Sequence, residues 1–149
     1  MNTLYDAASV KAIIDRIEGL SPTASGRWGK MKVSQMLAHC AEAIDMARGT
    51  KIMPRVFIGR IIGPLLKNKV LNEEPIKPNM PTHKEMAITD DRNFTSEQQR
   101  LINNIKLFHQ LGRTGIAKHI HPFFGMMTTE EWGRSAWKHL DHHLKQFGG

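Results

Sequence analysis

The stretch TTEEWGRSAWKHLDHHLKQF, residues 128–147, decides the interpretation of this chain because it predicts a helix with an unusual buried face. Thr128 and, three residues later, Glu131 form a capping-box start, and Gly148 and Gly149 form a stop. At about 100° per residue, one face carries apolar side chains and two histidines: Trp132, Ala136, His139, Leu140, His143 and Phe147. The opposite face carries charged side chains: Glu130, Glu131, Arg134, Lys138, Asp141 and Lys145. The sequence therefore predicts an amphipathic helix whose buried face includes two imidazoles.

His139 and His143 have i and i+4 spacing, so both rings project from one face of the helix and can reach a single ion. Helical H-E-x-x-H zinc sites use the same spacing. The alternative is a pair of core histidines bonded to neighbours or to buried water, because each ring needs partners for its nitrogens. The spacing leaves both interpretations open, and a metal site needs a third ligand from elsewhere.

The length and composition predict a single cytoplasmic domain. The chain has 149 residues, 40% of them apolar, which is enough for one domain, residues 1–149, with its own core. No apolar run approaches the roughly 18 residues of a membrane span, and the N-terminus lacks the basic and apolar regions of a secretory signal. Cys40 is the only cysteine, which excludes an internal disulfide and fits a reducing compartment.

The net charge is 21 − 14 = +7, and the excess is concentrated between residues 27 and 72. This region holds nine basic residues, at positions 27, 30, 32, 48, 51, 55, 60, 67 and 69, against Glu42 and Asp45. Such a surface could bind an anionic partner, either nucleic acid or an acidic small molecule. A solvated face is favoured instead, because the region lacks a glycine-rich phosphate loop and an aromatic ladder.

Periodicity predicts three further long helices and no strand pair. They are expected at Asp6–Glu18, Val33–Arg48 and Thr95–Leu111, the last opened by Thr95 with Gln98 and closed by Gly112. Together with the last helix they predict an all-α four-helix bundle.

The connections between these helices are expected to be short or irregular. Gly59, Gly63 and Pro64 interrupt the apolar segment after the second helix, which predicts one or two short helices there. Residues 73–83 are rich in proline and predict an extended connection. Residues 112–125 predict a long loop whose phenylalanines close one end of the core.

Other candidate residues have weaker signals from their positions alone. His39 lies on the shoulder of the apolar face of the second helix, where a half-exposed histidine is expected. His109, on the third helix, is either a fourth ligand or a packed histidine. Glu42 is one turn after His39 and is a weak candidate for a general base. Cys40 is expected to be a small buried hydrophobe, and His83 to be exposed.

Five short motifs give the chain a resemblance to a known family. They are WGKM (28–31), QMLAHC (35–40), HPFFG (121–125), TEEWG (129–133) and KHLDHHLKQFG (138–148). With these motifs on predicted helices and turns, the chain resembles an uncharacterised branch of the DinB/YfiT-like metalloenzyme superfamily. The resemblance covers nearly the whole chain except the basic middle and implies a bacterial source.

The resemblance implies that His39, His139 and His143 together bind a divalent metal. It thereby makes His39 the expected third ligand, and it leaves His142 as a supporting or surface group beside the motif. Relatives include thiol-dependent S-transferases and a maleylpyruvate isomerase, which use bacillithiol, mycothiol or glutathione. Other members have no assigned activity, so the fold and the metal site are expected to transfer better than the reaction.

The leading functional hypothesis is a metal-dependent enzyme, because three imidazoles leave open coordination positions. The expected activity is either thiol transfer to a small electrophile or hydrolysis by metal-activated water. Zinc, nickel, and iron or manganese all suit these ligands. A low-molecular-weight thiol, a small-molecule substrate and a homodimer are further expectations. The alternatives are a non-catalytic stress-associated or binding bundle and, with less support, a nucleic-acid-binding accessory protein.

Overall fold

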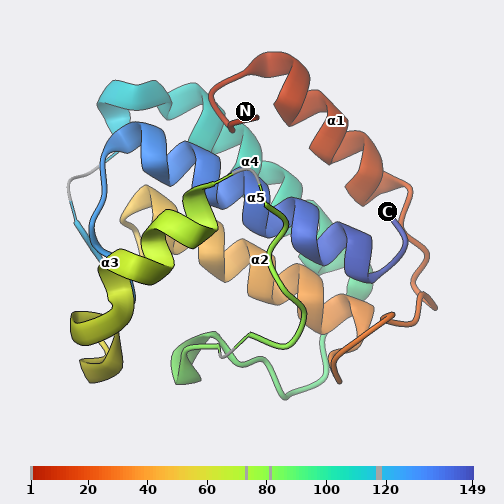
Figure 1. Ribbon diagram of the computed structural model, residues 1–149. Coiled ribbons are helices and arrows are strands. Elements are labelled where there is room, and N and C mark those ends of the chain that lie inside the picture. The colour runs from red at the N-terminus through yellow and green to blue at the C-terminus, as the bar shows by residue number, and fades with distance from the viewer. Residues whose placement is uncertain (1, 73, 81, 117–118) are drawn as a thin grey trace.

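The computed structural model describes residues 2–72, 74–80, 82–116 and 119–149, and these are mostly helical (Figure 1). Within them are five α-helices, a 3-10 turn and two short strands. In chain order these are α1 (Ala7–Glu18), α2 (Val33–Arg48), α3 (Phe57–Leu71), η1 (Lys84–Met86), α4 (Phe94–Gly115), β1 (Ile120–His121), β2 (Gly125–Met126) and α5 (Thr129–Gln146). The all-α prediction is therefore confirmed at the level of fold class.

Local capping signals place α1, α2 and α5 where the sequence predicted them. At the start of α5, the Thr128 hydroxyl accepts from the Glu131 backbone N–H at 3.2 Å, and the Glu131 carboxylate accepts from the Thr128 N–H at 2.7 Å. Asp6 caps α1 by accepting from the Ser9 N–H at 2.7 Å. Gly49 ends α2 with φ 81°, a left-handed conformation that glycine adopts at little cost.

The start and the end of α4 differ from the prediction. Asn93, rather than a capping box at Thr95 and Gln98, caps the helix by accepting from the Ser96 N–H at 2.9 Å. The Gln98 amide instead donates to the Ile17 carbonyl at 2.8 Å, so it joins α4 to α1. Gly112 does interrupt the helix, with φ 61° and ψ −172°, but a further turn continues to Gly115.

The segment expected to form one or two short helices is a single helix of 15 residues, α3. Its glycines mark close approach rather than interruption. A Cβ at Gly59 would lie 2.8 Å from the Phe123 Cα, and a Cβ at Gly63 would collide with the Phe123 carbonyl. The glycines therefore let the α3 backbone lie directly against the turn between β1 and β2. Beyond α3, residues 74–80 and 82–83 contain no helix or strand, as predicted; positions 73 and 81 lie outside the described residues.

The predicted loop at 112–125 contains a small hairpin that the sequence analysis missed. Ile120 pairs with Met126 and His121 with Gly125 in antiparallel register. Gly125 has φ 76°, which a residue with a side chain would adopt only with strain. Residues 117 and 118 of the predicted loop lie outside the described residues.

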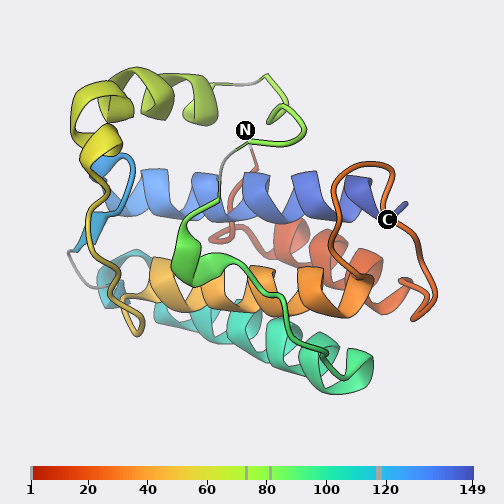
Figure 2. The same ribbon diagram turned by 90° about the horizontal axis from the view of Figure 1, so that it is seen from below.

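Four helices enclose the core. Helix α2 packs against α4 and α5, and α1 packs against the same two helices (Figures 1 and 2). The largest fully buried apolar side chains lie between them: Leu4, Ile13, Ile17, Met36, Leu37, Ile44, Leu101, Ile105, Phe108, Leu140 and Leu144. Helix α3 lies outside this group and contacts α5 and the hairpin strand β2. Burial of these side chains fixes α2 beside α5 and thereby brings their histidines together.

None of the described helices is both long enough and apolar enough to cross a membrane.

Candidate metal centre

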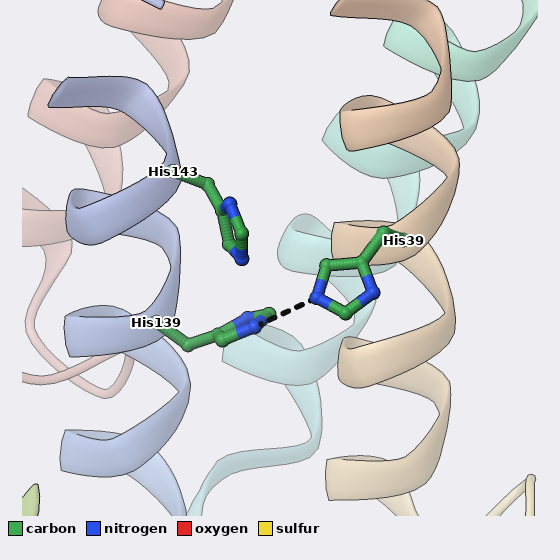
Figure 3. A group of neighbouring side chains, drawn as sticks. All are labelled: His39, His139 and His143. Carbon is green, nitrogen blue, oxygen red and sulfur yellow. Dashed lines mark hydrogen bonds between the residues drawn. The ribbon is translucent and has the colours of Figure 1, made fainter. Parts of the chain in front are cut away.

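Three histidines from two helices converge at one point. His39 comes from α2, and His139 and His143 come from successive turns of α5 (Figure 3). Each ring offers one nitrogen, and these nitrogens all lie within 4.8 Å of one another. Tetrahedral zinc with nitrogen ligands would hold them about 3.3 Å apart, and the Nε2 atoms of His39 and His139 already lie 3.1 Å apart. Any separation longer than this would have to shorten when an ion binds.

A backbone carbonyl fixes the ring of His39. Its Nδ1 lies 2.8 Å from the Met86 carbonyl oxygen in η1. A carbonyl only accepts, so Nδ1 carries the proton and Nε2 turns its lone pair toward the other two rings. This is how metal-binding histidines are commonly oriented. His39 is 4% exposed, so the sequence-based expectation of a half-exposed residue is wrong.

A side-chain amide does the same for His143. Its Nδ1 lies 2.8 Å from Gln146 Oε1, and the Gln146 amide nitrogen donates to the Trp28 carbonyl at 2.6 Å. The second bond sets which way the amide points, because only its nitrogen can donate to a carbonyl. His143 Nδ1 therefore donates to Gln146, and Nε2 is free to face the site. Both His143 and Gln146 are buried.

His139 has no such support within the described residues. Its Nε2 lies 3.1 Å from His39 Nε2, and its buried Nδ1 has no hydrogen-bond partner. Because His39 Nε2 is unprotonated, His139 donates to it and its own Nδ1 stays an unpaired acceptor. An unsatisfied buried polar group costs about 1–3 kcal/mol. A metal held at Nε2 would leave this Nδ1 unpaired as well, so the fit of the site to a divalent transition metal rests on its three nitrogen donors.

Electrostatics keep the three rings neutral at neutral pH. Burial lowers the pKa of His139 well below its ordinary value, and the neighbouring rings of His143 and His39 lower it further. Burial also lowers the pKa of His143 to about 3. Burial lowers the pKa of His39, although the Met86 carbonyl and the Glu42 charge oppose this. Neutral imidazole is the form that binds a metal.

The structure separates the three other candidate residues. His142 is half-buried, with its ring 5.1 Å from that of His143 and 5.3 Å from that of Trp28, so it lies beside the three histidines. His109 is not at the site, because its Nδ1 pairs with the Leu4 carbonyl at 3.0 Å. Its proposed role as a ligand is therefore not supported by its position.

Glu42 is held away from the site by two cations. Its carboxylate pairs with Lys51 and with Arg100, each at 2.6 Å. These partners lower its pKa against the effect of its burial. It is thus a poor general base, and its negative charge acts on the site by opposing the effect of burial, which lowers the pKa of His39.

A cavity of about 320 Å³ opens beside the three rings. Six of the eight histidines line it: His39, His83, His121, His139, His142 and His143. No aspartate, glutamate, lysine or arginine is among the described residues that line it. The described lining of the cavity is thus uncharged, although the protein as a whole carries a net positive charge.

Two of these histidines were missed by the sequence analysis. His83 was predicted to be exposed but is 9% exposed and accepts from the Glu85 N–H at 3.2 Å. The Nδ1 of His121 accepts from the backbone N–H groups of Phe123 and Phe124, each at 3.1 Å. A histidine before Pro-x-x-Gly, placed to cap the turn that follows, was the available signal.

A protein-family model described as "Protein of unknown function (DUF1569)" matches residues 4–148 of the chain. The matched region includes every residue of the three-histidine group and of the cavity. The searches of curated proteins and of solved structures gave no significant match.

Proposed function

This chain belongs to that family of unknown function, and we propose that it is a divalent-metal-dependent enzyme whose ligands are His39, His139 and His143. The observation that carries the proposal is the convergence of three ring nitrogens, two of them oriented by hydrogen bonds at the opposite side of the ring. Three neutral imidazoles leave at least one coordination position for water or substrate, as catalytic sites do and structural sites do not.

We further propose that α1, α2, α4 and α5 form a four-helix bundle of the DinB/YfiT-like type, as one domain. Support comes from the pairwise packing of these helices and from a ligand pattern with one histidine on the second helix and an H-x-x-x-H pair on the last. Helix α3 and the hairpin are then additions to the bundle: the hairpin turn lines the cavity through Phe123 and Phe124, and α3 packs against α5 and β2.

The proposed chemistry is thiol transfer to a small electrophile or hydrolysis of a small molecule. When bound, a divalent cation such as zinc, nickel, iron or manganese would lower the pKa of a thiol or water and polarise an acceptor. The chain's own residues hold His39 and His143 in one tautomer and line the cavity with a mainly apolar wall. No described carboxylate lines the cavity, so proton transfer falls to His142, His121 or solvent.

The nucleic-acid-binding alternative has less support. Among the basic side chains that the structure describes between positions 27 and 72, four make ion pairs within the protein, namely Lys32, Arg48, Lys51 and Lys67. Their partners neutralise much of the local excess charge. Binding to a nonspecific DNA duplex at low salt would revive this alternative.

Metal-dependent turnover tests the proposal. The chain, expressed without a histidine tag, is assayed with thiol–electrophile pairs and with small esters and amides, before and after EDTA treatment and with each metal restored. We expect one class of substrate to be turned over only by metal-loaded protein, and His139→Ala to abolish turnover. His109→Ala is the matched control, because it removes a histidine bonded elsewhere. Turnover that persists in His139→Ala would contradict the proposal.

A further inference from the structure

The lining of the cavity carries information about its ligand. Charged residues make up 23% of the chain, yet none of the described lining residues is charged. An ionised ligand group placed here would lose its hydration without gaining a protein counter-ion. The part of a ligand that lies against this wall is therefore uncharged.

The wall is also apolar and adaptable. Five methionines line it: Met31, Met46, Met53, Met80 and Met86. Four aromatic residues join them: Trp28, Phe123, Phe124 and Trp132. Thioethers and aromatic rings make favourable contacts with flat apolar molecules. An apolar cavity of about 150 Å³ is enough to bind benzene. A cavity of about 320 Å³ can therefore hold a molecule roughly twice the size of benzene.

One polar group in this wall has a fixed direction. His121 is 7% exposed, and its Nδ1 accepts two backbone N–H bonds, so its proton is on Nε2. Its ring stacks on Phe124 with centroids 4.2 Å apart, which holds the ring plane. Burial lowers the pKa of His121 to about 3, so the ring is a neutral donor at neutral pH. Such a donor can bind or polarise a carbonyl oxygen.

We propose that the cavity binds an uncharged, mainly apolar molecule bearing one hydrogen-bond acceptor such as a carbonyl oxygen, with His121 Nε2–H donating to that acceptor. The inference rests on the proposed function in that this molecule is the enzyme's substrate. It narrows that function: the charged groups of a thiol such as glutathione stay outside the cavity, and only its sulfur and the electrophile lie inside.

Four bicyclic probes of matched shape test the ligand class: the ketone 1-indanone, the hydrocarbon indane, the anion indane-1-carboxylate and the cation 1-aminoindane. Their dissociation constants are measured by ligand-observed NMR with the full chain, as purified and after EDTA treatment, since a bound cation could attract the anion. In EDTA-treated protein we expect 1-indanone to bind about tenfold or more tightly than either ion. We expect the affinity for 1-indanone to exceed that for indane by roughly two- to tenfold, which is the contribution of one hydrogen bond.

Two variants locate the binding. His121→Asn keeps Oδ1 as an acceptor for the backbone N–H groups, but its shorter amide places no donor where His121 Nε2–H lies. The affinity for 1-indanone should therefore fall to that for indane. Ala43→Phe, from a half-buried position on the cavity wall, should fill the space and abolish binding of all four probes. Equal or tighter binding of an ion in EDTA-treated protein, a lack of binding by every probe, or full binding by Ala43→Phe would overturn the inference. Should His121→Asn fail to fold, the preference of the wild-type protein for 1-indanone over indane decides the role of the donor.

The outcome is independent of the metal. A protein that retains no metal but selects 1-indanone refutes the proposed metal-dependent function and supports the ligand class. A protein that binds metal but prefers the ions does the reverse.

Discussion

Gln146 links the proposed metal centre to the loop before α2, and its replacement by methionine tests that link. The residue is 2% exposed and makes two bonds, accepting from His143 and donating to the Trp28 carbonyl. Methionine has a similar length and volume, so Gln146→Met removes the polar groups without leaving a large hole. The effect of the substitution is then mainly that of the lost hydrogen bonds.

The expected magnitudes follow from these two contacts. Loss of Gln146 leaves the Nδ1–H of His143 and the Trp28 carbonyl without partners, at about 1–3 kcal/mol each. Because Trp28 is half-buried and water can reach its neighbourhood, we expect the free energy of unfolding to fall by about 2–4 kcal/mol. Loss of an outer partner of a ligating histidine lowers metal affinity by about 10–100-fold. Gln146→Met should therefore weaken zinc binding by that factor.

Urea denaturation of EDTA-treated protein measures the stability, and competition with a chromophoric chelator measures zinc affinity. Gln99→Met is the matched control, because Gln99 is exposed and bonds only Asn103 within α4. The control should change the free energy of unfolding by less than about 0.5 kcal/mol. Wild-type zinc affinity in Gln146→Met would refute the claim that this amide orients His143.

Three further predictions concern the rest of the fold. Gly133→Ala should destabilise the protein, because the added Cβ would collide with the Tyr5 ring, even though alanine is about 1 kcal/mol more favourable than glycine inside a helix. Gly19→Ala is the control: its Cβ would make only ordinary contacts, so the free energy of unfolding in urea should change little. Cys40 is buried and burial raises the pKa of its thiol, so it should react with Ellman's reagent only after unfolding; rapid reaction of native protein would show that α2 is not packed as described. Burial raises the pKa of Tyr5, the only tyrosine, to about 12, so tyrosinate absorbance should appear about two pH units higher in folded than in unfolded protein. The stabilisation that comes from the protonated phenol should be lost as the pH rises from 10 to 12. Identical titration curves for folded and unfolded protein would contradict the burial of Tyr5.

Local signals in the sequence were sufficient to predict the helices that carry the three histidines. The ends of α2 and α5 depend on Gly49 and on the Thr128–Glu131 capping box, which act within one turn and need no tertiary partner. The i and i+4 spacing of His139 and His143 likewise fixed their common face. His39 was recognised only through the family resemblance, because its burial depends on how α2 packs against α5.

The parts that could not be predicted depend on contacts between distant segments. The glycines of α3 resemble helix breakers in sequence, and only the close approach of Phe123 explains them. The partner of His39 is a backbone carbonyl at Met86, and a carbonyl has no signature in sequence. Nothing in the sequence marks Gln146, because its role depends on the end of α5 lying beside the Trp28 carbonyl. The three candidate histidines were thus identified from the spacing in α5 and from the family resemblance, whereas the groups that orient them were not.

The metal content of protein expressed without a histidine tag tests the central claim most directly. After incubation with zinc and exhaustive dialysis, elemental analysis by mass spectrometry should find close to one ion per chain in the wild type and in His109→Ala, and far less in His139→Ala. Wild-type protein without bound zinc, or His139→Ala with as much zinc as the wild type, would contradict a metal site at His39, His139 and His143.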